Sequence, residues 1–381
     1  MRITRGQLYQ LQIPFNESFA HSTKERTFSD ALVLCLETDT GIKGFGEGLP
    51  RPYVTGETVT SAMAHIQESL WPKISAHRFE PLQSLDDLSQ FDRALGEPDG
   101  GEVLAPNAAR CAAEIALVDC SLRAQNKGLG EFLVPLRESV EYAGVIPAGE
   151  PERAARHAEK MTMLGLKHLK IKVASGDDLA RIRSVMGVIG AETGIRLDAN
   201  AAWNLADAEK AIPGFEQFPI LAIEAPITRS TTEDLVSYKM KTTMPVCVDE
   251  YLVTIEDAKQ LIDSKACDIF NLRISKLGGI WRTWHIAQMA LRAGLKLQVG
   301  AQVGETAILS AAGRHLLAAL PDVLFAEGSA GCFLLTEDVA QEGIEFGMGG
   351  VAPILSGPGL GITVQPDVLE KYAVSVTDLV I

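Results

Sequence analysis

The segment IRLDAN at 195–200 is one of four evenly spaced apolar runs, the others being LKHLKIKV at 166–173, LAIEAP at 221–226 and PVCVDE at 245–250. Short runs rich in Val, Ile and Leu are typical of strands buried on both faces. Helical patterns lie between the runs, and the spacing is close to one strand plus one helix, the repeat unit of a βα barrel. We therefore predict an α/β fold with a TIM-type (β/α) barrel.

The 381-residue chain is long enough for a barrel and a second domain. Strands precede helices at the start of the chain, and TDTG at 38–41 with the following GIKGFGEG at 41–48 is read as hairpin sequence. From about residue 141 strands and helices alternate, with a shortened eighth helix expected near TEDVA at 336–340. We assign the chain to three parts: an N-terminal α+β capping domain at 1–130, the (β/α) barrel at 131–355, and a C-terminal segment at 356–381 that returns to the capping domain.

A doubly wound open sheet is the competing fold. It would carry a glycine-rich phosphate turn after its first strand, and VIPAGEPERA at 145–154 does not have that pattern.

Composition narrows the range of partners. The net charge of −14 argues against nucleic acid or an anionic membrane as a partner. No apolar run approaches the roughly 20 residues of a membrane span, and the N-terminus lacks the apolar core of a signal peptide. The six cysteines are scattered and form no CxxC pair, as expected of buried thiols in a reducing cytoplasm. We expect a cytoplasmic protein that binds a small molecule.

Three acids, Asp198, Glu224 and Asp249, end successive apolar runs. In a barrel these strand ends converge, and like charges gather there only around a cation. Carboxylates are hard oxygen ligands suited to Mg²⁺ or Mn²⁺, and no His or Cys stands nearby at zinc-like spacing. The simpler interpretation is that each acid caps the following helix. Three acids at matching positions favour the metal.

Lys170 and Lys172 lie two apart on one strand and therefore point to the same face. Inside the barrel, burial and mutual repulsion would lower the pKa of each amine and make it a useful base. The alternative is a solvated strand in which Leu169, Ile171 and Val173 face inward. Lys276 follows the sixth run, across the barrel from the second, so two lysines could exchange a proton on opposite faces of one carbon. Alone, Lys276 reads as an exposed loop lysine before two glycines.

Together these motifs resemble those of the enolase superfamily, in its muconate lactonizing enzyme (mandelate racemase/muconate lactonizing enzyme-like) subgroup. The matching elements are K-x-K (Lys170, Lys172), D-x-N (Asp198, Asn200), I-E-x-P (Glu224), V-D-E (Asp249, Glu250) and K-x-G-G (Lys276). The resemblance implies that the three acids bind Mg²⁺, that Lys172 and Lys276 act on opposite faces of the carbon α to a carboxylate, and that Lys170 assists the carboxylate. Glu305 and Glu327, after the seventh and eighth strands, are candidate orienting groups.

The subgroup converts one enediolate into several products. We expect a Mg²⁺-dependent isomerase of the cycloisomerase or racemase/epimerase type. The alternatives are a β-elimination lyase (o-succinylbenzoate synthase-like or an acid-sugar dehydratase), a Schiff-base barrel aldolase that uses Lys172 or Lys276, and a non-catalytic binding homologue. Family members are often dimers or octamers, so a homo-oligomer is expected.

Substrate choice in the subgroup is expected from two capping loops, here 14–26 and about 50–57. Lys24 or Arg26 could pair with a second substrate carboxylate. Dipeptide epimerases of the group carry Asp-x-Asp on the eighth strand to hold an ammonium group. This chain has FAEGSAG there, with only Glu327, which puts a dipeptide substrate in doubt.

Overall fold

The computed structural model describes residues 1–20, 25–97 and 104–380, so Lys24 and the tip of the 14–26 loop lie outside the described residues. The N-terminal region contains an antiparallel sheet in the order β16-β1-β4-β5, formed by Ala373–Leu379, Ile3–Leu11, Leu32–Thr38 and Lys43–Gly48. The last strand of the chain thus pairs with the first. A separate hairpin, β2 (Ile13–Ala20) and β3 (Glu25–Ser29), extends toward the barrel mouth.

The helices of this region precede the barrel: α1 (Val59–His65), α2 (Trp71–Ala76), α3 (Ser89–Leu95) and the long, almost fully buried α4 (Asn107–Ala124), with a π turn at Ile66–Leu70 and a 3₁₀ turn at Leu85–Leu88. The predicted hairpin forms between β4 and β5, with Gly41 in its turn. Gly44, Gly46 and Gly48, however, belong to strand β5 and not to the turn. They alternate along β5 and face α4, where a Cβ on Gly46 would lie 2.0 Å from the carbonyl oxygen of Ala112. Glycine is needed because strand and helix backbones touch here.

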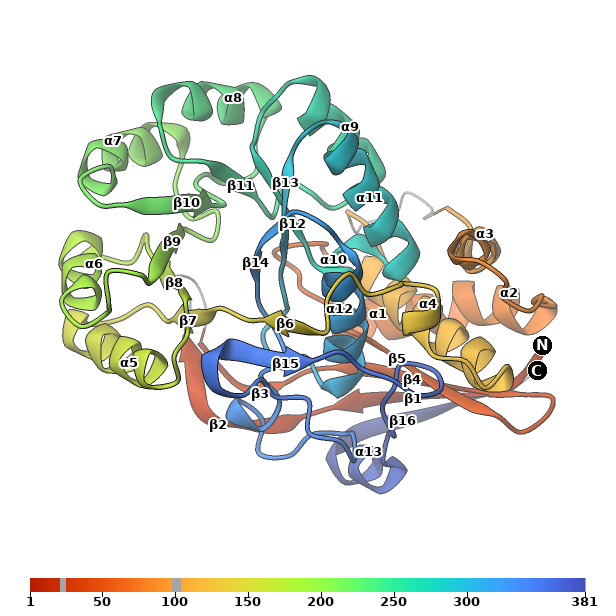
Figure 1. Cartoon of the computed structure of the whole chain (residues 1–381). Coiled ribbons are helices and arrows are strands. Elements are labelled where there is room, and N and C mark those ends of the chain that lie inside the picture. Colours follow the sequence, from red (N-terminus) through yellow and green to blue (C-terminus); the bar gives the residue numbers. More distant parts are fainter. Residues whose placement is uncertain (21–24, 98–103, 381) are drawn as a thin grey trace.

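Eight parallel strands form the barrel sheet, in the order β7 to β14: Gly144–Ile146, His168–Lys172, Gly194–Asp198, Ile220–Glu224, Val246–Val248, Ile269–Leu272, Lys296–Val299 and Val323–Ala326. A backbone hydrogen bond of 2.8 Å from the nitrogen of Ala143, just before β7, to the oxygen of Ala326 in β14 links the two ends of the sheet. The predicted TIM-type barrel is therefore confirmed (Figure 1).

Helices alternate with these strands: α5 (Pro151–Met163), α6 (Asp178–Met186), α7 (Leu205–Phe215), α8 (Thr232–Lys241), α9 (Ile255–Asp263), the short α10 (Ile274–Leu277), α11 (Ile280–Arg292) and α12 (Ala307–Ala319). Several start at a side-chain cap, and Thr254 forms a reciprocal capping box with Asp257 at α9.

The structure has no helix at 336–340, so the prediction of an eighth barrel helix there is wrong. After β14 the described chain forms only 3₁₀ turns at Gly331–Phe333 and Met348–Gly350 and strand β15 (Val351–Pro353), which pairs with β6 (Ser139–Glu141), before α13 (Pro366–Tyr372). The wall beside α5 is therefore built of irregular chain.

Carboxylates from the N-terminal region cap barrel helices. Glu114 of α4 accepts hydrogen bonds from the backbone nitrogens of Ile280 and Trp281 at the start of α11, both 2.9 Å long. Glu47 of β5 accepts from the nitrogens of Thr306 and Leu309 at the start of α12. A carboxylate stabilises a helix N-terminus because its free N–H groups lack partners within the helix. The two regions therefore share buried polar contacts as well as apolar packing.

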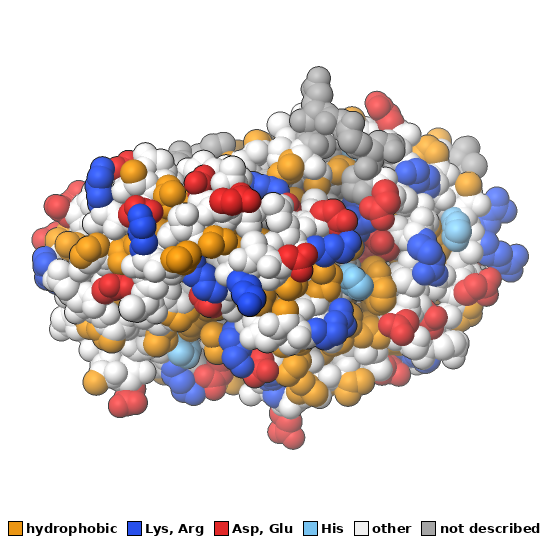
Figure 2. All heavy atoms as spheres, turned by 90° about the horizontal axis from the view of Figure 1, so that it is seen from above, with side chains coloured by type: hydrophobic (Ala, Val, Ile, Leu, Met, Phe, Trp, Pro, Cys, Tyr) orange, Lys and Arg blue, Asp and Glu red, His pale blue; other side chains and the backbone are white. Residues whose placement is uncertain are grey.

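The surface seen from above carries basic and acidic side chains side by side, with hydrophobic side chains between them (Figure 2). This face has no broad field of one charge sign. None of the described helices is long and apolar enough to span a membrane.

Candidate active site

The three predicted metal-binding acids lie together at one end of the barrel. Asp198 is the last residue of β9 and Glu224 the last of β10, and the two are paired neighbours in the sheet. Asp249 follows β11, the next strand. All three carboxylates are fully buried. Because they end adjacent parallel strands, their side chains lie at the same mouth of the barrel.

The two lysines of β8 are buried inside the barrel, which excludes the solvated-strand alternative. Lys172 Nζ lies 2.6 Å from Asp198 Oδ2 and 2.8 Å from Asn200 Oδ1. Lys170 Nζ lies 3.1 Å from Asp198, 3.3 Å from Glu224 and 2.6 Å from Glu327. The alternation of the strand thus places both amines among carboxylates.

Lys170 differs from the expectation of a lowered pKa. Burial does lower the pKa of its amine, but the negative charges of Glu224, Glu327 and Asp198 outweigh burial and raise it above its ordinary value. Lys170 is therefore a permanent cation beside Glu224, suited to stabilising negative charge rather than to accepting a proton.

Lys276 reaches the site from α10. Its amine is fully buried and donates to the side chain of Asp249 over 2.8 Å, to the Asp249 carbonyl and to the carbonyl of Asn271. Burial and the nearby guanidinium of Arg273 hold the pKa of Lys276 well below its ordinary value. Lys276 and Lys172 thus extend into the site from opposite sides of the barrel, and each is hydrogen-bonded to a different acid.

Two buried arginines complete the site, and sequence reasoning missed both. Arg196, two residues before Asp198 on β9, pairs with Glu224 at 2.9 Å and with Glu327, and stacks over the ring of Phe325. Arg273 pairs with Asp249. The available signal was the period of two: Arg196 lies on the same strand face as Asp198.

Of the other four predicted site residues, three lie among the lysines and acids and one does not. Asn200 contacts Lys172, and Glu250 is buried beside Asp249, with burial and the charge of Asp198 raising its pKa to about 7. Glu327 lies between Lys170 and Arg196, which lower its pKa against the effect of burial. Glu305 does not reach the lysines. Its carboxyl accepts from the backbone nitrogen of Gln302, and burial raises its pKa to about 8.

The donor set suits a hard divalent cation. Asp198, Glu224 and Asp249 supply only oxygen, and Glu250 Oε2 and Asn271 Oδ1 are buried beside them without hydrogen-bond partners. In the described residues no three Asp, Glu, His or Cys side chains close around one point, because lysine and arginine groups lie between the acids. The oxygen atoms of these residues are suitable ligands for a metal ion. In this structure the three acids are paired with lysine and arginine side chains instead.

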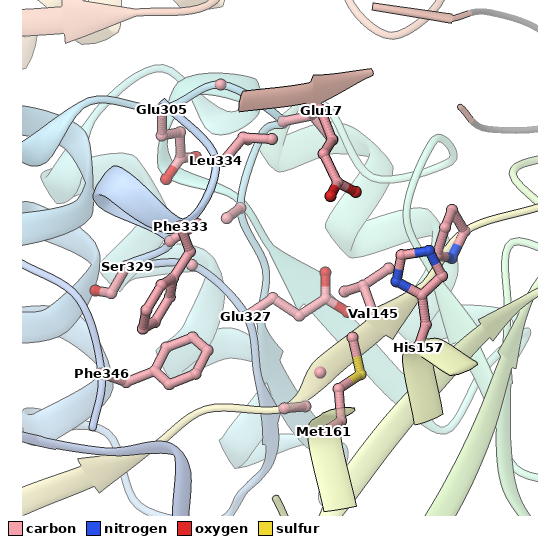
Figure 3. Close-up of a pocket in the computed structure, with 18 of the residues that line it drawn as sticks. Glu17, Val145, His157, Met161, Glu305, Glu327, Ser329, Phe333, Leu334 and Phe346 are labelled. Atoms are coloured by element: carbon pink, nitrogen blue, oxygen red, sulfur yellow. The ribbon is translucent and has the colours of Figure 1, made fainter. Parts of the chain in front are cut away.

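Two connected spaces adjoin these groups. A small inner cavity of about 60 Å³ is lined by Lys170, Lys172, Asn200, Arg273 and Glu327, with Tyr53 from the N-terminal region. A larger chamber of about 460 Å³, here called the outer chamber, shares Val145, Glu327 and residues 301–303 with it. Figure 3 shows Phe333 and Phe346 on one side of the outer chamber, His157 and Met161 of α5 on the other, and Glu17 of β2 above.

Comparison with known proteins gives matches to one family of enzymes. Residues 153–368 match the model of the enolase C-terminal domain-like family. The chain is 27% identical to the N-succinyl-L-Arg/Lys racemase of Bacillus cereus over 98% of both chains, and the crystal structure of the racemase has a TM-score of 0.89 at 26% identity, covering 99% of this chain and all of that one.

Two further matches are to proteins with other activities. The chain is 26% identical to muconate cycloisomerase 1 of Rhodococcus opacus, over 95% of this chain and 96% of that protein. A dipeptide epimerase of Enterococcus faecalis, whose crystal structure is complexed with Mg and the dipeptide L-Leu-L-Tyr, has a TM-score of 0.85 at 26% identity, over 95% of this chain and all of that one.

Proposed function

The chain belongs to the enolase C-terminal domain-like family, in the muconate lactonizing enzyme subgroup, and we propose that it is a Mg²⁺-dependent isomerase that removes the proton α to a carboxylate. The observation that carries this proposal is the burial of Lys172 and Lys276 at one barrel mouth, each hydrogen-bonded to a different acid on either side of Glu224. Racemisation, epimerisation and cycloisomerisation all use this half-reaction.

Asp198, Glu224 and Asp249 would hold the metal, which supplies positive charge to the substrate carboxylate as its α-carbon loses a proton. The relative complexed with Mg supports this choice, and Mn²⁺, with the same preference for oxygen ligands, is a further candidate.

The three lysines have different roles in proton transfer and charge stabilisation. Lys172 accepts the α-proton on one face of the carbon, and Lys276 donates or accepts on the other, as inversion of a stereocentre requires. Lys170, whose charge is fixed by Glu224 and Glu327, stabilises the negative charge that develops on the carboxylate oxygens. Charge stabilisation matters because an α-proton beside a carboxylate is a very weak acid.

The substrate is a small-molecule carboxylate, and a free dipeptide is disfavoured within that class. Glu327 is already paired with Lys170 and Arg196, and the hydroxyl of Ser329, two residues on, donates to the hydroxyl of Tyr142. Neither position offers an unpaired acid for a substrate ammonium group. A homo-oligomeric, cytoplasmic enzyme stays our prediction.

Solvent deuterium exchange tests the proposal. With Mg²⁺ present, a panel of N-acyl amino acids, dipeptides, muconates and acid sugars is followed by NMR and mass spectrometry. We expect incorporation at an α-carbon that EDTA abolishes. Lys172→Ala and Lys276→Ala should each lose exchange on one enantiomer more than on the other. Absence of exchange with every acid, in protein shown to bind Mg²⁺, would reject the proposal.

A further inference from the structure

The outer chamber occupies the place beside α5 where the described chain after β14 forms no barrel helix. It meets the inner cavity at Val145, Glu327 and residues 301–303, so a substrate held at the lysines can extend into it without leaving the protein. Its volume, about 460 Å³, is large for water alone and typical of a small-ligand site.

One wall of the chamber carries a row of basic residues. Arg153, His157 and Lys160 follow one another on α5 at i, i+4 and i+7, which places them on the same helix face. Within the described residues, no carboxylate lies within ion-pair distance of Arg153 or Lys160, although 24 other ion pairs have formed. Positive charge on this wall is therefore left without a partner.

The acids facing the row do not balance it. Glu327 is already paired with Lys170 and Arg196. Glu305 is protonated at neutral pH because burial raises its pKa to about 8. Among the described residues that line the chamber, only Glu17 of β2 faces the row as a free carboxylate, and Figure 3 shows it above the chamber near His157. Burial, with Arg153 and Lys160 nearby, lowers the pKa of His157, which disfavours a positive charge on its ring.

The opposite wall is apolar. Phe333 and Phe346 lie edge to face with ring centroids 5.3 Å apart, and Leu334 continues the wall. Met161, Leu164 and Leu166 add apolar surface on the α5 side. The chamber thus combines an apolar lining with two unpaired cations.

We propose that the outer chamber binds the arm of the substrate remote from the reacting carbon, and that Arg153 and Lys160 receive an anionic group at its end. The substrate is then a dianionic acid: one carboxylate lies at the lysines, and an apolar arm joins it to a second anion. This assignment rests on the proposed function, because it takes the α-carboxylate to sit beside Lys172 and Lys276. Arginine is well suited to the outer contact since its guanidinium matches a carboxylate with two parallel donors.

Binding is tested first with probes that cannot react. N-Succinyl-, N-glutaryl- and N-adipoyl-2-methylalanine have no α-hydrogen, and each is compared with its neutral terminal amide by calorimetry in the presence of Mg²⁺. We expect the acid to bind about tenfold more tightly than its amide at the best arm length, the value of one charged hydrogen bond. Arg153→Met with Lys160→Met should remove that preference. Arg156→Met, which removes one exposed charge from the same helix outside the chamber, should keep it.

Equal affinity of acid and amide at every arm length, or a preference that survives the double substitution, overturns the assignment. Deuterium exchange on the corresponding N-acyl alanines separates the two proposals. Exchange that favours the amides would reject the anion subsite and leave the proposed function standing. Charge-selective binding of the probes, without exchange on the alanine derivatives or on any other acid of the panel, would reject the proposed function and leave the subsite standing.

Discussion

The side-chain nitrogen of Asn107 donates to the carbonyl oxygen of Lys276 over 2.6 Å, and also to that of Val253 over 2.8 Å. Asn107 begins α4 in the N-terminal region, whereas Lys276 is a candidate base of the barrel. The backbone nitrogen of Leu49, after β5, likewise donates to the hydroxyl of Ser275. Elements more than 150 residues away in the chain therefore fix the backbone that carries this lysine.

Asn107→Ala is expected to disturb the reaction on one face of the substrate. Two buried carbonyls lose their donor, and α10 can shift, which moves Lys276 but not Lys172. Misplacement of a catalytic group by about 1 Å can cost up to about a hundredfold in rate. We expect the ratio of deuterium exchange rates of the two enantiomers to change by about tenfold or more.

Leu122→Ala is the matched control, since Leu122 is fully buried near the opposite end of the same helix. It should lower stability by about 2–5 kcal/mol and leave the ratio of exchange rates unchanged. A ratio that moves equally in both variants would show that Asn107 acts only through stability.

Removal of one proposed metal ligand should abolish stabilisation by Mg²⁺. At a concentration one hundred times its dissociation constant, a ligand of the native state adds about 2.7 kcal/mol to the free energy of unfolding. We expect a gain of this order in the wild type, measured by urea unfolding, and none in Asp249→Asn. Asp263→Asn, at an exposed position at the end of α9, should keep the gain. A gain retained in Asp249→Asn would remove Asp249 from the metal site.

The barrel could be predicted because its signal is local. Each buried strand is a short apolar run, and the acids that end three of them mark the mouth where strand ends converge. The lysines of β8 followed from the period of two. The raised pKa of Lys170 could not be predicted in this way. It depends on the charges of Glu224 and Glu327, which the fold brings from β10 and from beyond β14.

Contacts between distant segments were beyond sequence reasoning. The period of two places Arg196 on the same strand face as Asp198, but no local pattern identifies its partner Glu327, which comes from beyond β14. The glycines of β5 suggest turns until α4 is seen against them. Likewise, the described chain after β14 packs irregularly instead of forming a barrel helix, and this leaves room for the outer chamber. The sequence of this segment has no periodic pattern that would predict such packing.

His315 should make the fold sensitive to mild acid. Its ring is buried in α12, where Nε2 donates to the carbonyl of Leu360 over 3.0 Å, and burial lowers its pKa to about 4. Between pH 6.5 and 4 the unfolded chain binds a proton that the native state does not, so stability falls as pH falls through this window. The shift corresponds to at most about 3 kcal/mol.

His315→Gln can keep the donor to Leu360 without titrating, so we expect a shallower loss of unfolding free energy between pH 6.5 and 4, measured by urea titration at each pH. Glu47, Glu57 and Glu114, whose pKa values are raised to about 7 by burial, contribute a slope of opposite sign. That slope is common to both proteins and cancels in their difference. Parallel curves would show that His315 titrates alike in the folded and unfolded states.

Gly46→Ala tests the contact between β5 and α4. The added Cβ would lie 2.0 Å from the carbonyl oxygen of Ala112 and 2.4 Å from the nitrogen of Ala116, and both are backbone atoms that cannot rotate away. Strand and helix must separate, at a cost of about 3 kcal/mol or more in unfolding free energy. Gly313→Ala is the control, because its Cβ meets no heavy atom within 4 Å and alanine favours the helix α12 by about 1 kcal/mol. Since α4 also carries Asn107, Gly46→Ala should alter the enantiomer ratio in the same direction as Asn107→Ala, whereas Gly313→Ala should not.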